Sequence, residues 1–184
     1  MTISRCEQRR SAVAAAVLIV SLVIASPACK RHKRVMVRTV EEAPAMASVV
    51  ATADPNVASQ LVSGFYGVEQ NAWRWTAGRF SVILRPPRTA SNKGATLELK
   101  FAIPDVAIKK MRGVSLSAYV NGTALAPETY TQAGQFTYTR DIPANLLTGE
   151  VSRVDFSLDK TLPPSAADQR ELGIVVSMIG FLPK

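Results

Sequence analysis

Cysteine and histidine are nearly absent from this sequence. The chain has two cysteines and one histidine, Cys6, Cys29 and His32, and all three lie before residue 33. Any domain that follows therefore has no disulfide, no thiolate nucleophile and no imidazole. Zinc sites and catalysis by a Ser-His or Cys-His pair need these side chains, so both are excluded there. We expect no metal ion and no cofactor.

A basic excess is also missing outside the N-terminal segment. The chain has 22 basic and 14 acidic residues, and residues 1–40 contain eight of the basic residues and one of the acids. The rest of the chain is left with fourteen basic and thirteen acidic residues, a net charge of +1. Nucleic-acid binding requires a strongly basic surface, so we expect no nucleic-acid partner.

The first 29 residues have the order of a secretory leader. Three arginines precede an uncharged run, residues 11–29, that is rich in alanine, valine, isoleucine and leucine. A positive segment, an apolar segment and small residues at its end are typical of a signal peptide. The sequence Ser26-Pro27-Ala28-Cys29 resembles the bacterial lipobox, in which a diacylglycerol is attached to the cysteine. This resemblance implies lipidation at Cys29.

Other interpretations of the leader stay open. An apolar run of about 18 residues can also span a bilayer as an uncleaved signal anchor. Simple secretion is a third interpretation, and the basic block at residues 30–34 could reverse the topology. A lipid or an apolar helix at the N-terminus predicts a membrane partner. The expected location is the cell envelope, with the domain facing the periplasm or the exterior.

Residues 30–60 have the composition of a flexible linker. They are rich in alanine and valine, include two prolines, and lack aromatic side chains and a sustained hydrophobic period. Such a segment builds no core of its own, so we expect at most one short helical turn in it. The expected organisation is a signal peptide or membrane anchor over residues 1–29, a linker over 30–60 and a folded domain over 61–184.

Short alternating runs mark the folded domain. Along each run every second residue is apolar, which is the pattern of a β-strand with one buried face. Breaks that contain proline or glycine separate the runs, and no long amphipathic pattern is present. About seven or eight such strands predict an all-β fold, an antiparallel β-sandwich of the jelly-roll type. The alternating runs are residues 80–84, 97–103, 114–120, 136–139 and 154–158.

The dipeptide Asn121-Gly122 follows directly after one of these runs, residues 114–120. Asparagine and glycine both tolerate the positive φ angles that a type I′ turn requires. We therefore predict a β-hairpin at this point of the domain.

The most apolar run outside the leader lies within residues 168–181. A segment that is apolar on both faces is usually buried on both, in the middle of a sheet. We expect this segment to form the central strand on which the fold closes. Strict alternation places Ile174, Val176 and Met178 on one face, and Val175, Ile179 and Phe181 on the other.

A cluster of aromatic and polar residues at 64–76 contains both tryptophans of the chain. Flat aromatic rings bind the apolar face of a sugar ring, while Arg, Asn and carboxylate groups hydrogen-bond its hydroxyls. Trp73 and Trp75 share one strand face, however, and tryptophan is also a frequent core residue in sandwiches. The candidate ligand-binding residues are Tyr66, Glu69, Asn71, Trp73 and Arg74.

A second polar group, Asp168, Arg170 and Glu171, precedes the apolar part of the closing strand. These side chains could line a site, but we favour a structural role in which Arg170 pairs with Glu69 or Asp168. Glycoside hydrolysis needs two positioned carboxylates, and nothing in the sequence selects such a pair. We therefore expect no enzymatic activity.

Five short motifs lie in order along the domain, at residues 64–69, 74–76, 118–122, 163–165 and 168–173. Together they resemble a bacterial accessory domain of jelly-roll type. That domain is similar to galactose-binding-like and carbohydrate-binding modules and often occurs beside glycosyltransferase domains. The resemblance covers about residues 62–181. It implies a sandwich fold and an association with glycans, and it supplies no ligand residues.

Two hypotheses for the function follow. The first is a membrane-tethered, non-catalytic module of the cell envelope that binds glycan or assists polysaccharide handling. The alternative is a structural or protein–protein interaction module of the envelope, with its aromatic residues in the core and no sugar site. An open Trp73 beside Tyr66 and Arg74 would favour the first, and a buried Trp73 would favour the second.

Overall fold

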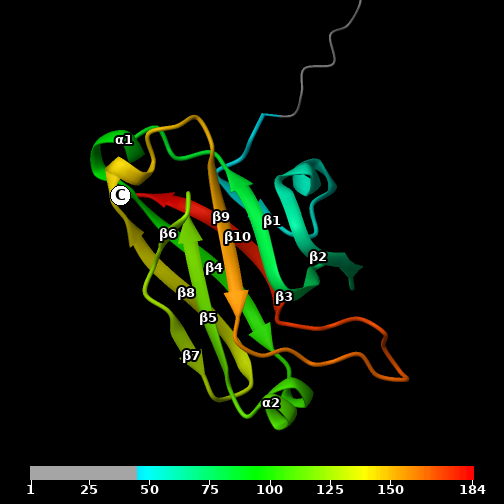
Figure 1. Cartoon of the computed structure of the whole chain (residues 1–184). Helices are drawn as coiled ribbons and strands as arrows, with labels where there is room; N and C mark the ends of the chain where they lie inside the picture. The colour runs from blue at the N-terminus through cyan, green and yellow to red at the C-terminus, as the bar shows by residue number, and fades with distance from the viewer. Residues whose placement is uncertain (1–44) are drawn as a thin grey trace, which may run out of the picture. The chain divides into compact units, whose positions relative to one another are not determined.

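The computed structural model describes residues 45–184 of the chain (Figure 1). The described residues lie within one compact unit. The expected leader, the lipidation site Cys29 and the first part of the expected linker lie outside the described residues. Between residues 45 and 184, no helix is both long and apolar enough to cross a membrane.

Residues 45–184 form ten strands and four short helices. Three of the strands, β1, β6 and β7, have only two or three residues, which is too short to show an alternation in the sequence. The strands are β1 (Val49–Ala51), β2 (Leu61–Glu69), β3 (Trp73–Leu84), β4 (Ala95–Ile103), β5 (Val114–Val120), β6 (Thr123–Ala124), β7 (Glu128–Tyr130), β8 (Gly134–Ile142), β9 (Ser152–Leu158) and β10 (Val175–Pro183). The helices are η1 (Pro55–Gln60), α1 (Ala90–Lys93), α2 (Asp105–Met111) and η2 (Ala144–Leu146).

The strands form a curled antiparallel sheet in the order β6-β5-β9-β3-β10-β4-β8. β3 is the strand at which the sheet turns from one layer into the other. Its first residues, at 74–75, pair with β10, whereas residues 79–84 pair with β9 along the same edge. In Figure 1, β5 and β9 lie in front of β10 and β4. The expected all-β sandwich is therefore confirmed.

The core lies between these two layers. The inward-facing residues of β4 alternate with outward-facing ones along the whole strand, as the sequence predicts. In the other layer, the rings of Phe80 and Phe156 stack with their centroids 4.8 Å apart, and Phe65 packs edge-on against Phe80. Large side chains that are fully buried include Phe80, Leu84, Leu97, Leu99, Ile103, Leu116, Tyr138, Ile142, Phe156 and Phe181.

β10 is a central strand, as the sequence predicts. It pairs with β4 along one edge, and with β1 and the start of β3 along the other. The preceding residue, Ile174, is fully buried, and its backbone N–H donates to the hydroxyl of Thr76 at 3.2 Å. The closing segment is therefore held on both edges.

The expected distribution of β10 side chains between two faces is wrong in detail. The register with β4 shifts between Val176 and Met178, so that Ser177 is an extra residue in a β-bulge. The bulge places Val176 and Ile179 on the same, buried face, whereas Met178 is only half-buried on the other side. The buried pairs across the two strands are Val176–Phe101, Ile179–Leu99 and Phe181–Leu97.

The sandwich also begins earlier in the chain than residue 61. β1 pairs with β10, and its Val50 is fully buried. After η1, the buried side chain of Gln60 donates from Nε2 to the carbonyl oxygens of Ala47 and Ile83, at 3.0 Å and 2.7 Å. Residues 47–60 therefore belong to the folded domain. The expected linker over 30–60 is too long at its C-terminal end. The reason is that a three-residue strand leaves no period in the sequence.

Candidate functional site

The hairpin that joins β2 and β3 carries the five residues expected to bind a ligand. Its turn has two consecutive residues with positive φ, Gln70 at 51° and Asn71 at 54°, as in a type I′ turn. The same geometry occurs at the predicted hairpin between β5 and β6, where Asn121 has a φ of 49° and Gly122 a φ of 84°. The prediction at Asn121-Gly122 is confirmed, and Asn71 has a structural role in its own turn.

Arg74 lines neither of the two cavities described below. Its cross-strand partner on β10 is the buried Val176, and its guanidinium donates to two backbone carbonyl oxygens. Nε lies 2.6 Å from the oxygen of Thr52, and Nη1 lies 2.8 Å from that of Tyr66. These bonds join the segment after β1 to β2, so Arg74 ties neighbouring elements together.

Tyr66, Glu69 and Asp168 surround a second arginine, Arg170. The Arg170 guanidinium lies 2.8 Å from Oδ2 of Asp168 and 2.9 Å from Oε1 of Glu69. It also stacks over the Tyr66 ring, 5.2 Å from the centroid, and the Tyr66 hydroxyl donates to the carbonyl oxygen of Glu171 at 2.8 Å. The predicted pairing of Arg170 is confirmed, with both acids at once.

This ion-pair network fixes the loop between β9 and β10 against β2. Hydrogen bonds from the side chain and backbone of Arg170 lower the pKa of Asp168 from 3.8 to about 2. The same contacts raise the pKa of Arg170. A carboxylate held ionised in this way cannot serve as a general acid near neutral pH. The network is therefore structural, and it occupies the functional groups of Tyr66 and Glu69.

Trp73 and Trp75 lie outside the buried core. Both rings are half-buried, and they pack edge to face with their centroids 6.5 Å apart. Trp73 stands at the wall of a shallow groove of about 320 Å³, which we name the Trp73 groove. The core interpretation of the tryptophans is therefore wrong. Side chains that line the groove with Trp73 include Lys100, Ala102, Gln135, Thr137 and Val175.

The floor of the Trp73 groove is the outer face of β10, β4 and β8. Two rows of side chains cross it: Lys100 is paired with Thr137, and Ala102 with Gln135. Gln135 and Thr137 are exposed, and their side chains have no hydrogen-bond partner among residues 45–184. The groove therefore combines a half-buried indole ring with the neutral donors and acceptors of Gln135 and Thr137 and with the ammonium group of Lys100.

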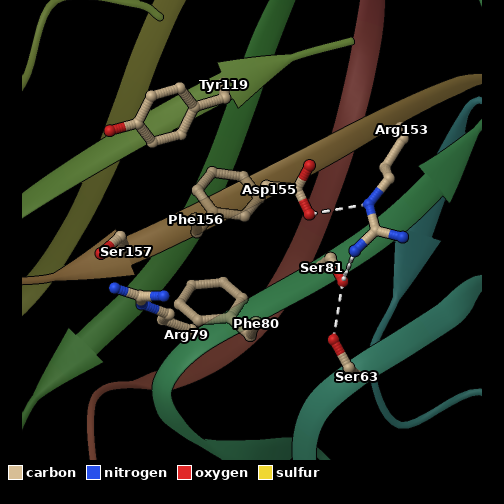
Figure 2. Close-up of a pocket in the computed structure, with 9 residues that line it drawn as sticks. All are labelled: Ser63, Arg79, Phe80, Ser81, Tyr119, Arg153, Asp155, Phe156 and Ser157. Carbon is tan, nitrogen blue, oxygen red and sulfur yellow. Dashed lines mark hydrogen bonds and ion pairs between the residues drawn. The ribbon is translucent and has the colours of Figure 1, made fainter. Parts of the chain in front are cut away.

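The opposite layer carries a larger pocket, of about 510 Å³, on the outer face of β2, β3, β9 and β5 (Figure 2). We name it the Arg79 pocket. Its polar residues are the outward members of strands that the sequence already predicts. These polar residues come together because the strands pair with one another. The alternating pattern in the sequence does not reveal that pairing. The outward side chains are Ser63, Arg79, Ser81, Tyr119, Arg153, Asp155 and Ser157.

A chain of hydrogen bonds crosses the Arg79 pocket from β9 to β2 (Figure 2). Nε of Arg153 donates to Oδ1 of Asp155 at 2.8 Å, and Nη2 donates to the hydroxyl of Ser81 at 3.1 Å. The Ser81 hydroxyl in turn lies 2.7 Å from that of Ser63. This chain fixes one guanidinium and one carboxylate at the pocket surface.

Neither cavity has the pair of carboxylates that glycoside hydrolysis needs. Asp155 is the one acid that lines the Arg79 pocket, and no acid lines the Trp73 groove. Within residues 45–184, no three side chains of the His, Cys, Asp or Glu type gather as they would around a metal ion. Both cavities are thus equipped for recognition by stacking, hydrogen bonds and charge.

No protein-family model matches the sequence, and no curated protein matches it either. Among solved structures, the chain is similar to an acetyl xylan esterase from the rumen bacterium Butyrivibrio proteoclasticus, with 13% identity and a TM-score of 0.45. The match covers 72% of this chain and 32% of the esterase, so the chain spans about a third of that protein.

Two carbohydrate-binding modules are also similar in structure. One is CBM36 in complex with calcium and xylotriose, with 10% identity and a TM-score of 0.40 over 72% of this chain and 98% of the module. The other is the CBM36-1 domain of a xylanase from the hindgut metagenome of Trinervitermes trinervoides, with 11% identity and a TM-score of 0.42 over 74% and 96%. Similarity at this level concerns the arrangement of the strands and not the ligand residues.

Proposed function

We propose that this protein is a non-catalytic module that binds a glycan in the Trp73 groove. The observation that carries the proposal is the half-buried indole ring of Trp73 at the wall of the groove, beside exposed polar side chains that have no hydrogen-bond partner among residues 45–184. Apart from Asn71 in its turn, the other expected ligand residues, Tyr66, Glu69 and Arg74, make structural contacts. Trp73 is the member of that set that lines the groove.

The groove has the two elements that sugar binding needs. An indole ring offers a flat apolar surface to the C–H face of a pyranose. The amide of Gln135 and the hydroxyl of Thr137 offer donors and acceptors to its hydroxyl groups. Ala102 and Val175 keep the floor between them low and apolar. The one charged residue that lines the groove, Lys100, is paired with Glu98 at 3.3 Å, so the remaining groups favour an uncharged saccharide.

The proposal includes a location in the cell envelope. The apolar run after three arginines and the lipobox-like sequence before Cys29 support a tether to a membrane, through a lipid or an uncleaved helix. A tethered module of this kind would hold a glycan, or a protein that handles glycans, close to the membrane. The rival is a module for protein interaction or envelope structure that has no sugar site.

A glycan array with the full chain in detergent micelles tests the proposal. Trp73 lines the groove and the Trp75 ring packs against it with 6.5 Å between the centroids, so intrinsic fluorescence reports occupancy of the groove. Trp73→Ala should weaken binding by about tenfold or more, since it removes the stacking surface.

Exposed Val106 on α2, substituted by alanine, is the matched control. If no neutral glycan binds, or if Trp73→Ala binds as tightly as the parent, the glycan proposal fails. The protein-interaction rival then takes its place.

A further inference from the structure

The Arg79 pocket is lined by more positive than negative side chains. Arg79 is exposed on β3, and its guanidinium has no hydrogen bond or ion pair among residues 45–184. Arg153 is different, because Asp155 and Ser81 both accept hydrogen bonds from it. With one carboxylate for two guanidinium groups, the pocket has a net positive charge that lies at Arg79.

The pocket also has groups suited to a hydroxyl-rich ligand. Tyr119 on β5 is 36% exposed, so its ring offers a flat surface at the far side of the pocket from Arg79 (Figure 2). Between them lie the Ser157 hydroxyl and the Asp155 carboxylate. Asp155 has a second oxygen, Oδ2, that accepts no hydrogen bond from a residue in 45–184. A carboxylate next to the arginines also discourages a dense polyanion such as a nucleic acid.

The spacing of the strands sets the size of the ligand. Arg79 pairs with Ser157, and Asp155 pairs with Tyr119, so Arg79 and Tyr119 are separated by two strand intervals across the sheet. At about 4.8 Å per interval this is roughly 10 Å across the strands. The two-residue offset along β9, from Ser157 to Asp155, adds about 7 Å in the perpendicular direction, so the two backbone positions lie roughly 12 Å apart. A single sugar ring is shorter than that distance, and a ligand that contacts both side chains needs at least two rings.

We propose that the Arg79 pocket binds an acidic oligosaccharide, with a uronate carboxylate on Arg79 and a sugar ring on Tyr119. A planar guanidinium binds a carboxylate through two parallel hydrogen bonds. Asp155 and Ser157 accept and donate hydrogen bonds at the sugar hydroxyls. A neutral ligand would cover Arg79 without replacing its hydration, so the pocket selects for the acid.

This site is independent of the Trp73 groove, because the two cavities open on different layers of the sandwich. The test uses the full chain in detergent micelles, a galacturonic acid oligosaccharide as the probe, and its methyl ester as the uncharged control. Titration calorimetry measures the affinity. Arg79→Gln and esterification of the probe should each weaken binding by about tenfold or more. Trp73→Ala should leave the affinity unchanged, and tryptophan fluorescence should not respond to the acid.

Three outcomes overturn the proposal. The acid does not bind, the ester binds as tightly as the acid, or binding is lost in Trp73→Ala and retained in Arg79→Gln. The last outcome places the acid in the Trp73 groove and leaves the proposed function standing. Thermal unfolding of Arg79→Gln is the folding control. It should match the parent, because the Arg79 guanidinium makes no bond to another residue in 45–184.

Discussion

The two outer faces of the sandwich share one core but differ in chemistry. The face of β10, β4 and β8 presents a half-buried indole ring, neutral polar groups and Lys100, which is paired with Glu98, around the Trp73 groove. The face of β3, β9 and β5 presents a more exposed phenol ring, two guanidinium groups and a carboxylate around the Arg79 pocket. One set of inward residues therefore supports two surfaces whose side chains can vary independently.

The difference teaches where recognition chemistry can be placed in this fold. Inward positions are fixed by packing, so the freedom lies in every second residue of each strand. β3 contributes to both cavities, with Trp73 at its start and Arg79 farther along. The loop network around Arg170 belongs to neither cavity. A substitution in this network should therefore change the stability of the fold and leave ligand binding unchanged.

The largest effect is expected in the core that both faces share. Ile179→Ala removes a fully buried side chain opposite Leu99, which typically costs about 2–5 kcal/mol of the free energy of unfolding. Met178→Ala should cost clearly less, because the β-bulge leaves Met178 half-buried. Chemical denaturation measures both. Equal losses of unfolding free energy in the two variants would contradict the position of the bulge at Ser177. Loss of one ligand site alone in Ile179→Ala would mean that the two faces do not share a core.

A smaller effect is expected at Asp168. Its folded-state pKa of about 2 lies below the ordinary 3.8, so the ion pair stabilises the fold above pH 3.8. This stabilisation is lost as the pH falls from 3.8 to about 2. Melting temperatures measured across that range should fall less in Asp168→Asn than in the parent. Both ligand affinities should be unchanged in this variant at neutral pH, since the network touches neither cavity.

The smallest effect is expected at Asn71. Asn71→Gly keeps the positive φ of the turn, so the hairpin and the Trp73 groove should both persist. Calorimetry with a neutral glycan should give the parent affinity. A marked loss of binding would return Asn71 to the set of ligand residues, and it would show that the Trp73 groove extends over the turn.

Local pattern predicts much of this fold. The alternation along β4, the type I′ turn at Asn121-Gly122 and the central place of β10 all follow from neighbouring residues alone. The pairing of Arg170 could also be predicted, because an arginine between acids at the edge of a core needs a partner.

Features that depend on distant pairing could not be predicted. The bulge at Ser177 exists because β10 must match β4, and β1 is a strand only because β10 offers it an edge. Arg74 faces inward because Thr52 and Tyr66 present carbonyl oxygens there. The Arg79 pocket is of the same kind, since its residues come from four strands that the sequence does not order.

The central place of β10 also affects when the chain can fold during its synthesis. Its partners β1, β3 and β4 all precede it in the chain, and Val49 of β1 pairs with Gly180 of β10. During synthesis, these three strands leave the ribosome while the strand between them is still missing, so the core cannot close until residue 183 has emerged. A topology with such distant pairings folds slowly, in about milliseconds to seconds. Nascent chains of this protein should therefore remain open to chaperones until residue 183 has emerged.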